Sequence, residues 1–143
     1  MKKQLFLLVA VCCVGFAGCA STNTSPQKAS ISKIIQDFSD GADKREVERV
    51  ASAFYNKSNQ FFMSKGNVVK LPMKQYLALL KNKKIGGVKR KLVIHSIDVT
   101  GEIASAKVTM HGAKYRFDNY ITFMKVSGKW KIVNNVLKLT KKG

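Results

Sequence analysis

Acidic residues and cysteines are scarce in this 143-residue chain, and both shortages restrict what it can do. It has 8 Asp plus Glu against 26 Lys plus Arg, which gives a formal net charge of +18. The 3 cysteines all lie within the first 19 residues, so the remainder can form no internal disulfide. At 45% hydrophobic residues the chain is too apolar for a disordered basic tail. Its length suits one domain with a modest core and excludes a large separate cofactor domain.

The first nineteen residues have the organisation of an export leader. Lys2 and Lys3 precede an apolar run over residues 5–14, which is too short to span a bilayer comfortably. The run leads to Phe16-Ala17-Gly18-Cys19, which resembles the lipobox of bacterial lipoproteins, with Phe16 in place of the usual Leu. The resemblance implies that the leader is cut before Cys19 and that this cysteine carries the lipid. An ordinary secretory leader cut near the same place is the alternative.

The leader divides the chain into three predicted segments. Residues 1–18 form the signal peptide, residues 19–30 are the lipidated Cys19 with a flexible polar tether, and residues 31–143 form the folded domain. A protein anchored in this way lies in the bacterial cell envelope. The absence of Asp directly after Cys19 resembles lipoproteins that are passed to the outer membrane, which predicts a domain facing the periplasm. Chromosomal DNA is out of reach there, so we expect a membrane partner and no nucleic acid.

Apolar residues in the first half of the domain recur with the helical period. Three such stripes are present, over residues 31–38, 47–54 and 73–80. The turn signal Asp40-Gly41 predicts the end of the first helix, and Asp43, three residues before Glu46, predicts the N-cap of the second. Gly66 predicts the turn of a small hairpin, and Pro72 is well placed to begin the third helix.

From residue 92 onward the apolar period changes to two, which predicts β-strands. Three dipeptides mark the hairpin turns between four strands: Thr100-Gly101, Gly112-Ala113 and Ser127-Gly128. The chain therefore has helices first and then a four-stranded antiparallel meander. This order predicts the α+β fold class.

The hairpin turns also determine which side chains share a face of the sheet. With two-residue turns, Ala106, Phe123 and Trp130 fall on one apolar face, which we expect to be the inner one. The ligand-pocket candidates are the polar residues of this face and two helix tyrosines: His95, Asn119, Asn134, Tyr55 and Tyr76. The alternative is that they are hydrogen-bonded interior groups without a ligand. A bulge near Ser96 would move His95 to the opposite face.

Several segments together resemble the putative lumazine-binding family of nuclear transport factor 2-like domains, over roughly residues 31–140. They include Phe38-Ser39-Asp40-Gly41, Ile94–Val99, Phe117–Lys125 and Gly128–Asn134. The resemblance implies a cystatin-like cone in which about three N-terminal helices pack on a curved antiparallel sheet around a pocket. Members of the superfamily serve as isomerases, cyclases, dehydratases, binding modules or dimerisation scaffolds, so the resemblance implies the fold more firmly than the function.

Two surfaces suggest partners. The outer sheet face is half apolar, with Tyr120, Met124, Val133, Leu137 and Leu139 beside Thr122 and Asn135. Homodimers of the superfamily commonly use this face, which suggests that the domain forms a homodimer through it. The loop over residues 81–91 holds six basic and no acidic residues, and Lys83, Lys84, Lys89 and Arg90 are its candidate contacts with anions.

These observations leave three functions open. The first is a lipid-anchored, non-enzymatic domain that binds a small ligand or an envelope partner. The second is an isomerase or dehydratase-like enzyme with His95 as general base, and the third is a basic surface that binds anionic lipid or polysaccharide. We favour the first, because the chain lacks a glycine-rich phosphate loop, a nucleophile elbow and paired inner carboxylates. It also lacks metal-spaced His and Cys residues, so we expect no metal and no cofactor.

Overall fold

The computed structural model describes residues 25–143, and the predicted leader and Cys19 lie outside this range. The elements in chain order are α1 (Pro26–Lys44), α2 (Val47–Ala53), β1 (Phe54–Ser64), β2 (Asn67–Pro72), α3 (Met73–Lys81), β3 (Lys91–Thr100), β4 (Ile103–His111), β5 (Tyr115–Val126) and β6 (Lys129–Lys141). Within this range, no helix is both long and apolar enough to cross a membrane.

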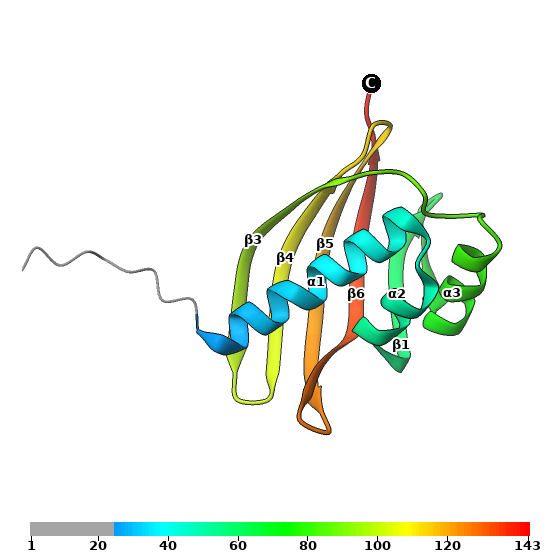
Figure 1. Cartoon of the computed structure of the whole chain (residues 1–143). Coiled ribbons are helices and arrows are strands. Elements are labelled where there is room, and N and C mark those ends of the chain that lie inside the picture. The colour runs from blue at the N-terminus through cyan, green and yellow to red at the C-terminus, as the bar shows by residue number, and fades with distance from the viewer. Residues whose placement is uncertain (1–24) are drawn as a thin grey trace, which may run out of the picture.

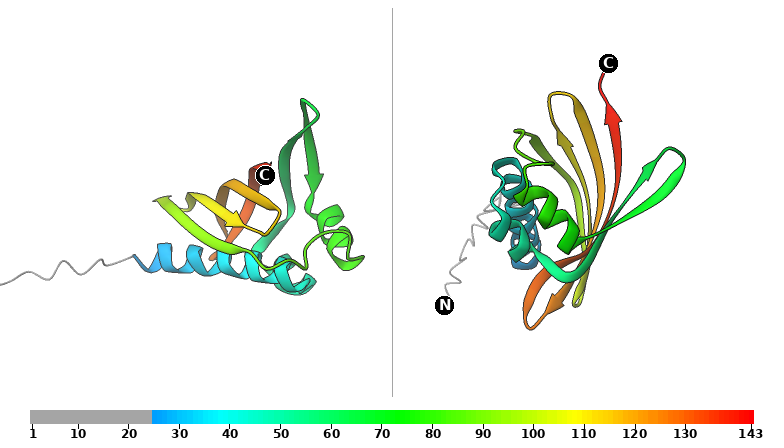
Figure 2. Two further views of the ribbon diagram at one scale, coloured as in Figure 1. Left: turned by 90° about the horizontal axis from the view of Figure 1, so that it is seen from above. Right: turned by 90° about the vertical axis from the view of Figure 1, so that its right-hand side faces the viewer.

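The six strands form one sheet with the order β2-β1-β6-β5-β4-β3 (Figure 1). Neighbouring strands are antiparallel except β1 and β6, which run parallel. All three helices lie on the same side of the curved sheet, while the β1–β2 hairpin swings away from them (Figure 2). We call the side under the helices the helix face and the other side the open face. The predicted α+β class, with three helices packed on a curved sheet, is confirmed.

Helix α1 begins five residues before the predicted start of the domain. Ser25 caps it by accepting a hydrogen bond from the Lys28 N–H at 3.3 Å, and Pro26 occupies the first turn, where its missing N–H costs nothing. The predicted tether is therefore wrong for residues 26–30, which are helical. The rest of that segment lies outside the described residues.

Helix α1 also continues through the predicted stop at Asp40-Gly41 and ends at Lys44. Gly41 is buried against the next helix, where an added Cβ would lie only 2.8 Å from Val50 Cγ2. This glycine therefore serves close packing between α1 and α2 and does not make a turn. Arg45, in the left-handed conformation at φ 59°, ends the helix instead.

The predicted N-cap of the second helix is also wrong. Asp43 belongs to α1, and its carboxylate binds Arg90 across 47 residues of sequence. Helix α2 begins at Val47, and its N-cap residue Glu46 makes no side-chain capping bond. The capping-box spacing failed because a buried guanidinium competes for the same carboxylate.

The three hairpins and the start of the third helix were predicted correctly, but only Ser127-Gly128 forms the predicted two-residue turn. The first turn is Gly101-Glu102, because Thr100 pairs with Ile103. In the β4–β5 hairpin His111 pairs with Arg116, so the loop is longer than two residues and the predicted register is off by two. Because the shift is even, every side chain keeps its face. In the β3–β4 pair a bulge between Ile94 and Ser96 reverses the face of His95.

A second bulge lies in the last hairpin, where Thr122 pairs with Asn134 and Phe123 with Ile132, so that Val133 on β6 is left without a partner in the register. Ile121 consequently pairs with Asn135 and not with the predicted Asn134. Trp130 is buried on the helix face, as predicted. The largest apolar side chains that are fully buried, at less than 2% exposed, are Phe123, Ile31, Ile35, Leu80, Met110, Ile121, Ile132, Val50 and Val108.

Candidate functional site

Three amide side chains meet in the buried interior of the helix face, and we call them the amide cluster: Gln60, Asn119 and Asn135. Asn135 donates from Nδ2 to Asn119 Oδ1 at 3.1 Å and to Gln60 Oε1 at 3.4 Å. All three residues are at most 3% exposed. Gln60 Nε2 and Asn135 Oδ1 have no hydrogen-bond partner among the described residues. The cluster thus retains one buried donor and one buried acceptor, each of which is costly to leave unbound.

The strand register builds this cluster. The parallel pairing of β1 with β6 places Gln60 opposite Asn135, and the bulge in the last hairpin turns Asn135 to the helix face. Next along the same face, Phe62 pairs with Leu137, which also pairs with Asn119 across the β5–β6 ladder. Phe62 and Leu137 are only half-buried. The amides therefore lie beside two half-buried apolar side chains.

Tyr76 from α3 supplies a phenol beside the amide cluster. Burial raises the pKa of Tyr76, although the charge of Arg90 and the neighbouring Gln60 amide act in the opposite direction. The phenol is therefore protonated at neutral pH and can donate a hydrogen bond. Its ring also packs against Phe38, with the ring centroids 6.4 Å apart.

The five ligand-pocket candidates do not all meet at this place. Asn119 and Tyr76 reach the interior, whereas Asn134 stays half-buried, opposite Thr122 on the open face, because of the bulge. Tyr55 is half-buried near the start of β1. The prediction missed Gln60 and Asn135; only the hydrophobic pattern of β1 could have drawn attention to Gln60.

His95 lies on the open face and is exposed, so the prediction that it faces the cone interior is wrong. Its Nε2 lies 2.8 Å from Thr109 Oγ1, and this hydroxyl donates to Asp118 Oδ1 at 2.9 Å. Because the Thr109 hydroxyl has a single proton, Nε2 of His95 must be the donor in their bond. Burial acts to raise the pKa of Asp118, but hydrogen bonds from Thr109 and Arg116 outweigh it, and the pKa is lowered. Asp118 is thus ionised, and His95 Nε2 is not free to act as a base.

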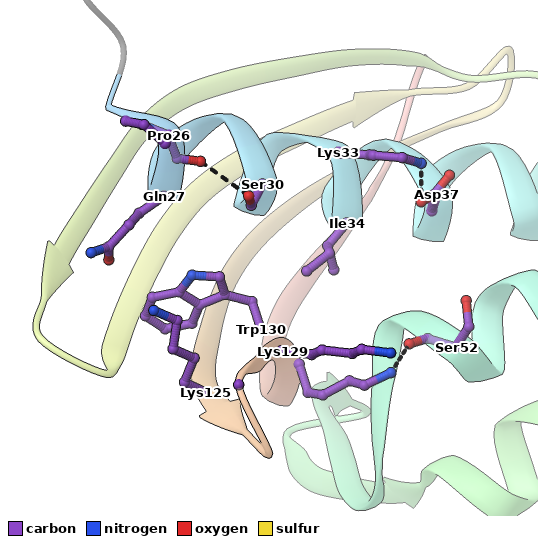
Figure 3. Close-up of a pocket in the computed structure, with 12 residues that line it drawn as sticks. Pro26, Gln27, Ser30, Lys33, Ile34, Asp37, Ser52, Lys125, Lys129 and Trp130 are labelled. Carbon is purple, nitrogen blue, oxygen red and sulfur yellow. Dashed lines mark hydrogen bonds and ion pairs between the residues drawn. The ribbon is translucent and has the colours of Figure 1, made fainter.

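A groove of about 500 Å³ lies between α1 and the end of the β5–β6 hairpin (Figure 3). Trp130 forms its inner wall beneath the helix, and Ile34 points down towards the sheet. Lysines from both elements line it: Lys33, Lys125, Lys129 and Lys131. We call this feature the lysine groove.

A second, more enclosed groove of about 610 Å³ lies on the open face. Tyr120 is 59% exposed there, and Met63 and Val136 are 61% and 48% exposed. Three residues that we predicted on this face do not belong to it. After the bulge, Asn135 is buried, and Leu137 and Leu139 follow the register of the helix face. Homodimerisation through this surface stays a prediction.

The predicted anion-binding loop is only partly a free basic surface. Lys83, Lys84 and Lys89 are exposed, but Arg90 is buried in an ion pair with Asp43, with both side chains 11% exposed. The Arg90 backbone N–H also donates to Asp43 Oδ2 at 2.8 Å. The assignment of Arg90 as a surface contact for anions is therefore wrong. In the part of the chain covered by the structure, no three His, Cys, Asp or Glu residues are grouped so as to hold a metal ion.

Comparisons with known proteins place this chain in a family. Residues 26–138 match the pattern of the putative lumazine-binding family over most of the chain. The chain belongs to this family. No curated protein matches it.

Solved structures share the nuclear transport factor 2-like (NTF2-like) fold. One from Shewanella baltica, described as an NTF2-like protein of unknown function, is 20% identical with a TM-score of 0.74, covering 81% of this chain and 95% of its own. Another of the same description, from Silicibacter pomeroyi, is 19% identical with a TM-score of 0.72, covering 80% and 96%. A cystatin-like protein from Nostoc punctiforme is 13% identical with a TM-score of 0.67, covering 82% and 93%. These likenesses establish the predicted NTF2-like, cystatin-like fold.

Proposed function

We propose that this member of the putative lumazine-binding family is a membrane-anchored binding protein that holds a small polar ligand at the amide cluster. The observation that carries the proposal is the pair of buried, unpartnered atoms, Gln60 Nε2 and Asn135 Oδ1. Leaving a buried donor or acceptor unsatisfied costs about 1–3 kcal/mol, and the Tyr76 phenol lies beside Gln60 as a further polar neighbour. A ligand that presents an acceptor and a donor together would satisfy both atoms.

The chemistry of the cluster favours a flat heterocycle with amide or imide edges. Such an edge places N–H and C=O groups side by side, which matches the donors and acceptors of Gln60 and Asn135. The ring of Phe62 and the side chain of Leu137 would cover the apolar faces of the heterocycle. Lumazine, which the family is named after, is a bicyclic heterocycle of this kind.

Membrane attachment through Cys19 is the second part of the proposal. It is supported by the apolar leader and the lipobox-like Phe16-Ala17-Gly18-Cys19. Helix α1 begins at Pro26, seven residues after Cys19, which leaves a short link between anchor and domain. The bacterial outer membrane, facing the periplasm, is the proposed location.

The ligand proposal is tested by native mass spectrometry of protein purified from the cell of origin, and by calorimetric titration with lumazine. We expect a stoichiometric small molecule, and a roughly 10- to 100-fold weaker dissociation constant for Asn135→Leu, from the lost hydrogen bond. Asn134→Leu is the matched control. It removes the same kind of amide one residue earlier, on the open face, where Asn134 pairs with Thr122. Equal affinity of both variants, or a native mass equal to that of the protein alone together with no lumazine binding, would contradict the proposal.

The anchor is tested separately by labelling cells with radioactive palmitate. We expect label on the wild-type protein and none on Cys19→Ser, because the thiol is the acylation site. Label that persists on Cys19→Ser would refute lipidation at this residue.

A further inference from the structure

We propose that the lysine groove binds the phosphate headgroup of an anionic phospholipid in the membrane that carries the protein. The groove is separate from the amide cluster and is built from other elements, α1 and the β5–β6 hairpin. Its position relative to the membrane rests on the proposed Cys19 anchor. The positive charge and the apolar wall of the groove come only from residues that the structure describes.

The charge of the groove is positive and largely uncompensated. Its one acidic residue, Asp37, is already paired with Lys33 at 2.8 Å and with Arg49 at 3.0 Å. Hydrogen bonds from Lys33 lower the pKa of Asp37, and so does Arg49, although burial opposes them. No acidic side chain of residues 25–143 forms an ion pair with Lys125, Lys129 or Lys131.

Three ammonium groups therefore remain to contact an anion. Lys125 Nζ lies 5.5 Å from the centre of the Trp130 ring, and Lys129 is exposed at the hairpin end. Lys131 donates to the Ser52 carbonyl at the end of α2, which uses one of its three N–H groups and fixes its position. Figure 3 shows Lys129 extending across the groove towards Ser52, below α1. Three cations beside a cavity of this size suit a phosphate monoester or diester.

The wall of the groove is apolar, which favours a lipid headgroup over an isolated inorganic anion. Trp130 is 6% exposed and lines the groove, together with the half-buried Ile34. Ser30 and Gln27 add neutral hydrogen-bonding groups from α1. The glycerol backbone of a phospholipid would lie against the indole and Ile34 while its phosphate meets the lysines.

The groove also lies at the end of the domain that is tied to the anchor. Pro26 itself lines it, and the seven residues from Cys19 span at most about 25 Å when fully extended. The exposed lysines of the 81–90 loop lie at the opposite end of α1, where Gly87 donates to the Ala42 carbonyl (Figure 1). Because α1 is about 28 Å long, the loop lysines lie farther from the anchored end of the domain than the lysine groove does.

The test measures binding of a chain that starts at Ala20 to vesicles, so that lipidation plays no part. Such a chain keeps every residue that the structure describes. Vesicles of equimolar phosphatidylcholine and phosphatidylglycerol are compared with pure phosphatidylcholine by co-sedimentation. Trp130, the only tryptophan of the chain, reports on the groove through its fluorescence. The variant is Lys125→Gln/Lys129→Gln, and its control, with the same loss of charge, is Lys83→Gln/Lys84→Gln.

We expect binding to the anionic vesicles with a change in Trp130 emission. Each lysine near an anionic surface contributes about 1 kcal/mol, so the Lys125→Gln/Lys129→Gln pair should weaken binding roughly 30-fold. The Lys83→Gln/Lys84→Gln pair should weaken it less than about threefold, since its lysines lie at the far end of α1. Ser30→Glu, which places a negative charge at an exposed groove position, should also weaken binding.

Three results would overturn the proposal. The first is equal weakening by both lysine pairs, which would mean attraction by overall charge alone. The second is equal binding to neutral vesicles. The third is a Trp130 response to inorganic phosphate with none to soluble dihexanoyl phosphatidylglycerol, which would assign the groove to free phosphate. If palmitate labelling fails while these vesicle results hold, the anchor is wrong and the headgroup site remains.

Discussion

Replacing Arg90 with methionine should destabilise the fold strongly, because the side chain is a buried tie between helix and sheet. Its Nε donates to Asp43 Oδ1, and Nη2 donates to the Ser39 carbonyl at 3.2 Å. The guanidinium carbon also lies 5.3 Å from the centre of the Phe117 ring. Removing the guanidinium leaves the Asp43 carboxylate buried without its partner.

The expected loss is about 3–5 kcal/mol, the usual cost of breaking a buried ion pair by removing one member. For a domain of this size, that corresponds to a fall in Tm of roughly 10–20 °C. Lys89→Met is the matched control one residue earlier. Its side chain is exposed, so we expect a change within about 0.5 kcal/mol.

Urea unfolding followed by circular dichroism and by Trp130 fluorescence measures both variants. The double variant Arg90→Met/Asp43→Leu should recover part of the loss, because no unpaired charge is then left in the interior. A loss below about 1 kcal/mol for Arg90→Met, equal to that of Lys89→Met, would refute the buried tie and return Arg90 to the anion-binding surface.

Two further outcomes follow from the backbone and from Asp37. Gly86→Ala should lower the free energy of unfolding in urea by at least about 2 kcal/mol, because φ is +69° and a Cβ would lie 2.4 Å from the Ala42 carbonyl oxygen. Gly128→Ala is the control: φ is also positive but the space around it is open, so the loss should be only about 1 kcal/mol. Asp37 has a pKa lowered by Lys33 and Arg49 despite its burial, so its stabilising contribution is present above the unfolded pKa near 3.8 and is lost as pH falls through the lower folded value. Asp37→Asn should flatten the acid limb of a stability–pH curve, and an unchanged slope would contradict the assignment.

Local sequence patterns predicted much of this fold. The period-two apolar runs after residue 92 and the glycine turns predicted the meander, and strand alternation placed Trp130 inside. The helical stripes predicted the buried faces of the first two helices, because Ile31, Ile35 and Val50 do face the core. In each case the deciding interactions lie within a few residues of one another.

The candidate site was harder to predict, because a bulge of one residue reverses every side chain beyond it. Asn134 and Asn135 are chemically identical neighbours, and only the bulge in the β5–β6 pair decides which one is buried. The same applies to His95 and the bulge after Ile94. Gln60 joined the site through a pairing between distant strands, which no local pattern records.

Arg90 shows a related limit. The six basic residues among the eleven of the 81–91 loop suggested a solvated surface, yet one of them, Arg90, forms an ion pair with Asp43 of α1. The composition of a loop predicts how most of its side chains behave, but it does not show that a single one, here Arg90, folds inward. The same contact explains why Asp43 does not cap α2.

The parallel pairing of β1 with β6 has a consequence for how the chain folds. Gln60 and Asn135 are neighbours in space but 75 positions apart in sequence, so the strand pair has a high contact order. A chain that emerges amino end first cannot close this ladder until β6 has appeared, and until then β1 presents an unpaired edge. The meander of β3 to β6 can form first, with β1 and β2 docking last. A chain truncated before β6 should therefore fail to reach the native state, rather than fold into a shorter version of it. The amide cluster forms only when β1 docks on β6 in this last step.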